Sequence, residues 1–175
     1  MNRMSAARLI VFFTAVLSLS AQGLINRRAP GFSLPDSALQ QHDLLDYRGS
    51  WLFLDFMKTD CPVCKNLSVK LEALKKKYGP KVAVLSIVIT PPETQTTVGK
   101  YVAETKITSP IVFDQSQVAI SYFKATPQSS GIDTPHLFAI SPTGMIVKDW
   151  SQVTVEAPGF LGELDQLIAG PPAKK

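Results

Sequence analysis

Residues 51–64, Trp-Leu-Phe-Leu-Asp-Phe-Met-Lys-Thr-Asp-Cys-Pro-Val-Cys, decide the fold of this 175-residue chain. The segment opens with an apolar run broken by one acid, which is typical of a central strand buried on both faces. Apolar residues then recur at helical spacing from Cys64 to Tyr78, and Gly79-Pro80 ends the pattern. Pro62 suits the first turn of a helix. The stretch therefore predicts a buried strand that leads through a short turn into a helix, with two cysteines at the start of the helix.

The rest of the chain predicts alternating strands and helices on both sides of this unit. A polar, extended lead-in is expected before it, and a hairpin with Gly144 in its turn is expected after it. The other expected strands are residues 81–90, 111–113, 136–141 and 145–150, and the other expected helices are residues 93–105, 115–123 and 160–168. The order predicts an α/β fold with a central mixed sheet, parallel strands joined by right-handed crossovers, and flanking helices.

The N-terminal stretch differs from everything that follows. Arg3 and Arg8 precede an apolar run over residues 9–19, and small residues come next. This pattern predicts either a cleaved secretory signal or an uncleaved signal-anchor over residues 1–21. Either alternative places a single domain, residues 22–175, in the periplasm or another extracytoplasmic space, free or held at the membrane by its N-terminus.

The charge of the chain gives no indication of a nucleic-acid partner. It holds 18 basic and 14 acidic residues, a net charge of +4. Residues 1–21 contain Arg3 and Arg8 and no acid, so 16 basic and 14 acidic residues remain without them, or +2. Because the basic residues are also scattered, we expect no nucleic-acid-binding surface.

The two cysteines form a single Cys-x-x-Cys pair, Cys61 and Cys64. One bridge across two residues closes almost no loop, so a structural disulfide framework is not indicated. A structural zinc site needs four ligands, and the two histidines, His42 and His136, have no metal-ligand spacing. The pair is therefore predicted to be redox-active.

The position of the pair at a helix start suggests how it reacts. Free backbone N–H groups and the helix dipole favour a thiolate at Cys61, and only a thiolate attacks a disulfide. Cys64, one turn further, can attack the resulting mixed disulfide and release the product. Cys61 is thus the expected nucleophile and Cys64 the more buried resolving thiol.

Several segments together resemble one known family. They are Ala29-Pro30-Gly31-Phe32-Ser33-Leu34, Leu45–Ser50, Leu54-Asp55-Phe56 followed by Cys61-Pro62-Val63-Cys64, Thr134-Pro135, and Ile140–Val147. At these distances they resemble the TlpA/ResA-type branch of the thioredoxin superfamily, with some redoxin character. The resemblance implies a thioredoxin-like three-layer fold and a thiol:disulfide oxidoreductase that needs no cofactor or metal. It also implies protein thiols or disulfides as substrates, and a membrane electron donor if the protein is a reductase.

Two further site residues follow from the resemblance. Asp55 stands six positions before Cys61 and matches the family's buried acid, which helps to move the proton of the resolving cysteine. Burial would raise its pKa into the range of a proton acceptor, whereas an Asp at a solvated strand end would have no such role. Thr134-Pro135 matches the family's Thr-Pro, whose peptide bond is cis and whose backbone pairs with substrate; an ordinary trans loop proline is the alternative.

Some features depart from the family or support rival functions. Asp60 occupies a position where the family usually has Trp, so the direction of electron flow stays open. His136 directly follows Pro135, and Cys61, Cys64 and His136 would form the copper site of a Sco-like metallochaperone. Thr59 lies one residue too close to Cys61 for a peroxiredoxin. The remaining rival is a binding module whose cysteine pair is idle.

Overall fold

The computed structural model describes residues 24–128 and 131–170. The predicted signal or anchor segment, residues 1–21, lies outside the described residues. Among those that are described, no helix is long and apolar enough to cross a bilayer.

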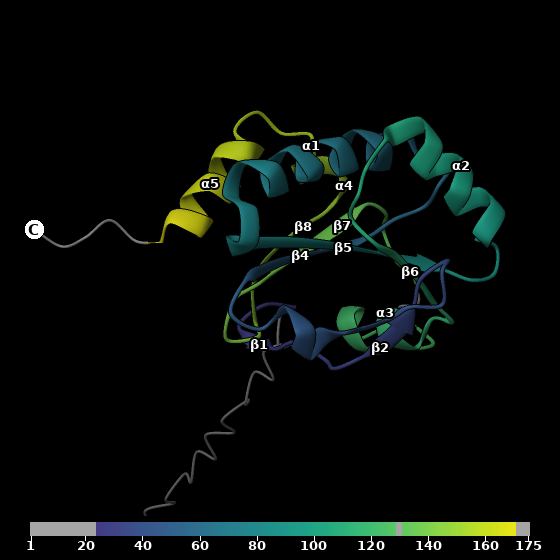
Figure 1. The fold of residues 1–175 in the computed structure, drawn as a ribbon. Coiled ribbons are helices and arrows are strands. Elements are labelled where there is room, and N and C mark those ends of the chain that lie inside the picture. Colours follow the sequence, from purple (N-terminus) through teal and green to yellow (C-terminus); the bar gives the residue numbers. More distant parts are fainter. Residues whose placement is uncertain (1–23, 129–130, 171–175) are drawn as a thin grey trace, which may run out of the picture.

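The fold is built on a six-stranded mixed sheet with the strand order β1-β8-β7-β4-β5-β6 (Figure 1). Parallel pairing joins β4 to β5 and β5 to β6, and antiparallel pairing joins β4 to β7, β7 to β8 and β8 to β1. The strands are β1 (Arg27–Arg28), β4 (Trp51–Phe56), β5 (Val82–Ile89), β6 (Ile111–Asp114), β7 (His136–Ile140) and β8 (Met145–Trp150). The strand that precedes the cysteines is thus central in the sheet.

Helices cover both faces of the sheet and complete three layers. Figure 1 shows α1, α2, α4 and α5 on one face, and α3 on the other with the small hairpin β2–β3. Their bounds are α1 (Pro62–Tyr78), α2 (Gln95–Thr105), α3 (Gln117–Phe123), α4 (Gln152–Val155), α5 (Phe160–Ala169), β2 (Ser33–Pro35) and β3 (Gln41–Asp43), with short 3-10 turns η1 (Leu44–Tyr47) and η2 (Gly79–Lys81). This arrangement confirms the predicted α/β, thioredoxin-like fold class.

Alternation along β4 divides the core between the two faces. Leu54 and Phe56 pack with Tyr122 of α3 on one side, whereas Phe53 packs with Leu67 of α1 on the other. Because successive strand residues point to opposite faces, Asp55 shares the face of Phe53. The one acid in this strand therefore lies under α1, the helix that carries the cysteines.

The sequence prediction missed the short elements at the edges. Strand β1, the hairpin β2–β3 and the four-residue α4 were not expected, since each is too short for a hydrophobic period to mark it. The hairpin turn is instead organised by Asp36, whose side chain accepts hydrogen bonds from the N–H groups of Ala38 and Gln40 at 2.8 and 3.0 Å. The longer predicted elements are present, with ends that differ by one or two residues.

Candidate active site

Cys61 lies at the junction between the central strand and α1. It is the N-cap residue of the helix, Pro62 occupies the first turn, and the N–H of Cys64 donates to Sγ of Cys61 at 3.1 Å. The first N–H groups of a helix have no partners within the helix and favour negative charge nearby. One such group thus points directly at the sulfur, which stabilises a thiolate there.

Cys64 has the opposite environment, although it is only one turn away. Both cysteines are free thiols; Cys61 is half-buried and Cys64 is fully buried. Burial raises the pKa of Cys64, as do its hydrogen bond with Cys61 and the nearby charge of Asp55, and the backbone N–H of Lys58 only partly offsets this. The pair therefore combines an accessible, ionisable sulfur with a buried one that needs help to lose its proton.

Asp55 is fully buried on the same face of the sheet. Neither of its carboxylate oxygens has a hydrogen-bond partner among the described residues. Burial without compensation raises the pKa of Asp55 to about 8. The expected burial is confirmed, and the raised pKa suits a group that takes up a proton near neutral pH; the catalytic role itself stays a prediction.

Thr134 and Pro135 lie at the same end of the sheet as the cysteines. Strand β7 begins at His136, which pairs with Phe56, the last residue of β4. The two residues before β7 therefore border the loop that leads from β4 to Cys61. The Thr134–Pro135 peptide bond is cis, Pro135 is buried and Thr134 is half-buried. Contact with substrate backbone at Thr134 stays a prediction.

The loop before Cys61 is held by a carboxylate that the sequence analysis missed. Glu93, which is 6% exposed, accepts hydrogen bonds from the N–H of Thr59 at 2.8 Å and from its hydroxyl at 2.7 Å. Thr97 of α2 donates a third at 2.6 Å. Burial works to raise the pKa of Glu93, but these bonds and the charge of Lys58 lower it overall. An ionised Glu93 thus anchors the approach to the nucleophile, and no local pattern reveals a contact across 34 residues.

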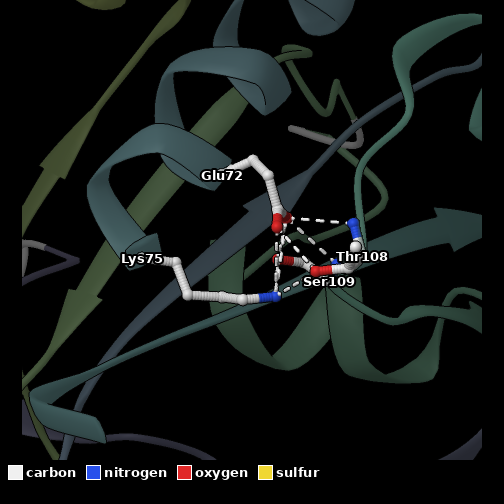
Figure 2. Close-up of polar contacts among 4 residues, drawn as sticks. All are labelled: Glu72, Lys75, Thr108 and Ser109. Carbon is white, nitrogen blue, oxygen red and sulfur yellow. Dashed lines mark hydrogen bonds and ion pairs between the residues drawn. The ribbon is translucent and has the colours of Figure 1, made fainter. Parts of the chain in front are cut away.

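A third buried carboxylate, Glu72, fixes the middle of α1 (Figure 2). Glu72 accepts hydrogen bonds of 2.6–3.1 Å from the backbone N–H groups and hydroxyls of Thr108 and Ser109, and Lys75 pairs with it at 3.4 Å. Burial alone would raise its pKa, but these donors outweigh burial and lower the pKa of Glu72 to about 2. This cluster ties α1 to the loop between α2 and β6 and keeps the cysteine helix in place.

The structure does not bring His136 to the cysteines. Its Nε2 pairs with Asp149 at 2.8 Å, and its ring packs against Phe123 and Phe138 on the α3 face of the sheet. The thiol of Cys64 lies on the opposite face. No cluster of three metal-ligating side chains occurs within residues 24–128 and 131–170. The ligand set of the copper alternative is therefore not assembled.

Thr59, whose spacing from Cys61 argued against a peroxiredoxin, donates its hydroxyl hydrogen to Oε2 of Glu93. The exclusion of a peroxidatic site stays a prediction.

Comparison with known proteins assigns the family. The profile of the AhpC/TSA family matches residues 25–149. The chain belongs to the AhpC/TSA family. The matched residues include the central strand β4, the cysteine helix α1 and nearly all of the β7–β8 hairpin.

Two curated relatives have names that describe a redox protein or a thioredoxin-like protein. "Thiol-disulfide oxidoreductase ResA" of Geobacillus thermodenitrificans is 28% identical over 137 residues, which is 78% of this chain and 72% of ResA. "Thioredoxin-like protein YneN" of Bacillus subtilis is 30% identical over 97 residues, 55% of this chain, and the alignment spans only 57% of YneN. These similarities confirm the resemblance to ResA-type thioredoxin-fold oxidoreductases and, at the level of relatives' names, the predicted enzyme class.

Solved structures agree on the fold. A putative protein disulfide isomerase from Bacteroides thetaiotaomicron superposes with a TM-score of 0.67 at 23% identity, covering 83% of this chain and 87% of that one. At this identity the similarity establishes the thioredoxin-like fold alone.

Proposed function

We propose that this protein is an exported thiol–disulfide oxidoreductase that exchanges dithiol and disulfide with protein partners through Cys61-Pro62-Val63-Cys64. The hydrogen bond from the N–H of Cys64 to Sγ of Cys61 carries the proposal, because it places an accessible sulfur where a thiolate is stabilised. Asp55, which is buried without a hydrogen-bond partner among the described residues, supports the proposal as a proton acceptor for the second sulfur. The names of the ResA relatives support the same reaction.

The proposed mechanism has two displacement steps. The Cys61 thiolate attacks one sulfur of a partner disulfide, which forms a mixed disulfide and releases the other partner sulfur as a thiolate. Asp55, once it has released its own proton to solvent, takes the proton of Cys64, and Cys64 attacks Sγ of Cys61. The Cys61–Cys64 disulfide forms, and the second partner sulfur leaves as a thiolate. The partner is reduced, the protein is oxidised by two electrons, and the reverse sequence oxidises a partner dithiol.

We propose the reducing direction for the cell. An oxidant of this fold is one whose reduced form is stabilised, chiefly through the thiolate of its first cysteine. Here Asp60 stands directly before Cys61, and a neighbouring carboxylate opposes a thiolate there. This feature favours the reducing direction. A protein reductase outside the cytoplasm needs a supply of electrons, for which a membrane donor is the expected source.

A trapping experiment tests the exchange reaction. In a Cys64→Ser variant the mixed disulfide on Cys61 cannot be resolved, so the variant expressed in its own host should accumulate covalent complexes that dithiothreitol releases. The matched control is Cys61→Ser, which keeps the buried thiol and should trap none. Equal amounts of complex from the two variants, or none from Cys64→Ser, would reject the assignment.

The reduction potential decides the direction. A value near that of thioredoxin, about −270 mV, supports the reductase proposal, and a value near about −120 mV supports a disulfide donor. The measurement uses the full domain equilibrated with glutathione buffers. If the pair never equilibrates with glutathione, the exchange function fails and the idle-pair alternative stands.

A further inference from the structure

Two buried hydroxyl groups lie beside the resolving cysteine and have no role in the mechanism above. Ser68 is on α1, one turn after Cys64, and Tyr101 is on α2; their oxygens are 2.7 Å apart. Ser68 is 4% and Tyr101 1% exposed. Tyr101 packs in the same buried cluster as Met57 and Cys64. The hydroxyl pair therefore joins α1 to α2 at the depth of the resolving thiol.

The hydrogen count of this pair leaves one O–H available. Two hydroxyls carry two hydrogens, and their mutual bond uses one of them. Among the described residues, the two hydroxyls have one other contact, from Ser68 Oγ to Sδ of Met57 at 3.9 Å. A thioether sulfur is a weak acceptor, so this contact holds the second hydrogen only weakly. Hydroxyl hydrogens rotate to suit their partners. When Ser68 donates to Tyr101, the phenolic hydrogen is free to turn toward a negative charge in the cluster.

The ionisable groups that face the pair supply such a charge. They are Asp55 from β4 and Cys61 and Cys64 from α1. Burial raises the pKa of Tyr101, the hydrogen bond with Ser68 partly offsets this, and the charges of these three groups raise the pKa further. The phenol thus stays protonated and remains a donor. The charge of Asp55 also raises the pKa of Cys64, so the two groups lie close enough to interact. In the proposed second displacement, the negative charge moves from Asp55 to Cys64 when Cys64 loses its proton.

We propose that the Ser68–Tyr101 hydroxyl pair is a positioning element of the resolving step, which turns its available O–H toward the negative charge shared by Asp55 and Cys64. The inference rests on the proposed function, since it concerns the second displacement of that reaction. The pair serves Cys64 and not Cys61, because Cys61 already has the helix N–H as its donor. A buried negative charge costs less free energy when a nearby O–H can turn toward it than when no such donor is present.

The two displacements can be observed separately with an aromatic disulfide, 5,5′-dithiobis(2-nitrobenzoate), in stopped flow. Attack by Cys61 forms a mixed disulfide and releases one coloured thiolate. Attack by Cys64 closes the Cys61–Cys64 disulfide and releases the second. The rate of the second release, measured across pH, reports the resolving step alone.

The test variant is Tyr101→Phe, which removes one buried oxygen and keeps the ring. Loss of one hydrogen-bond donor to a charge should slow the second release about three- to tenfold and move its pH midpoint upward, with the first release unchanged. Ser68→Ala should slow the same step, because it removes the partner that orients Tyr101. The matched control is Tyr122→Phe, a fully buried tyrosine on the opposite face whose hydroxyl donates to the carbonyl of Pro30 at 3.1 Å.

The outcomes separate this inference from the proposed function. Second-release rates and pH midpoints equal to wild type in both Tyr101→Phe and Ser68→Ala would overturn the inference, and so would an equal slowing of both releases in Tyr101→Phe and Tyr122→Phe. If Tyr101→Phe does not fold, Ser68→Ala alone decides by the same criteria. A wild-type protein that releases only one thiolate would instead overturn the proposed function.

Discussion

Replacing Asp55 with Asn is expected to stabilise the folded protein at neutral pH while it slows the second displacement. Asp55 is fully buried without a hydrogen-bond partner among the described residues, and its pKa is about 8 in the fold. In the unfolded chain the same group has a pKa of about 3.9. At pH 7 the native protein must therefore hold a proton that the unfolded chain releases. The difference between the two pKa values lowers the free energy of unfolding at pH 7 by at most about 4 kcal/mol. Asn does not ionise, so the variant should lack this penalty.

The sign of the pH dependence follows from the raised pKa. The folded state binds the proton of Asp55 more tightly, so the wild type is most stable below about pH 4 and loses this contribution as the pH rises to about 8. The advantage of Asp55→Asn should be near zero at pH 4, grow by about 1.4 kcal/mol for each pH unit above it, and level off above pH 8. Urea unfolding of the reduced proteins at intervals from pH 4 to pH 9 measures it.

Two results would refute this reasoning. A stability difference that does not change between pH 4 and pH 8 would mean that Asp55 is not a buried acid of raised pKa. A stabilised Asp55→Asn protein that releases the second thiolate from the aromatic disulfide as fast as wild type would mean that Asp55 takes no proton from Cys64. The control is Cys64→Ser, which should block the second release and show the wild-type pH dependence of stability.

Two other buried carboxylates, Glu72 and Glu93, give further tests. Glu72→Gln should lower the free energy of unfolding by about 2–3 kcal/mol at pH 7, as measured by urea unfolding. This loss should disappear as the pH falls from about 4.5 toward 2, because Glu72 is then protonated in the wild type as well. The control is Glu104→Gln, which removes an exposed ion pair with Lys65 and should leave urea unfolding unchanged. Glu93→Gln removes the charge that holds the N–H and hydroxyl of Thr59, and it should slow the first release, from Cys61, by about threefold or more in stopped flow. An unaltered first release would show that Glu93 only stabilises the loop.

The central part of the fold could be predicted because its signals are local. The apolar run of β4, the helical spacing of α1 and the glycine-containing hairpin turn each lie within a short window, so residues 51–78 and 136–150 have the predicted structure. The position of Asp55 under the helix follows from strand alternation alone. The hairpin β2–β3 has no such period, and its turn depends on one Asp side chain.

The supporting contacts of the site could not be predicted, because they join residues far apart in the chain. Glu93 reaches Thr59 across 34 positions, and Tyr101 reaches Ser68 across 33. Nothing in the sequence distinguishes Glu93 from any other acid near the start of a helix, or Tyr101 from any other apolar residue on a helix face. Only the packing of α2 beside α1 brings them to the cysteines.

A comparison of the buried acids shows which of them is suited to exchange a proton. Glu72 of α1 and Asp55 of β4 are both buried, and burial alone would raise the pKa of each. Glu72 accepts four hydrogen bonds from Thr108 and Ser109 and an ion pair from Lys75, so its pKa falls and it stays ionised at every physiological pH. A carboxylate that is satisfied in this way holds the helix but cannot exchange a proton. Asp55 has no such donor among the described residues, so its pKa stays near neutrality at a cost in stability, and the proposed role in proton transfer would account for that cost.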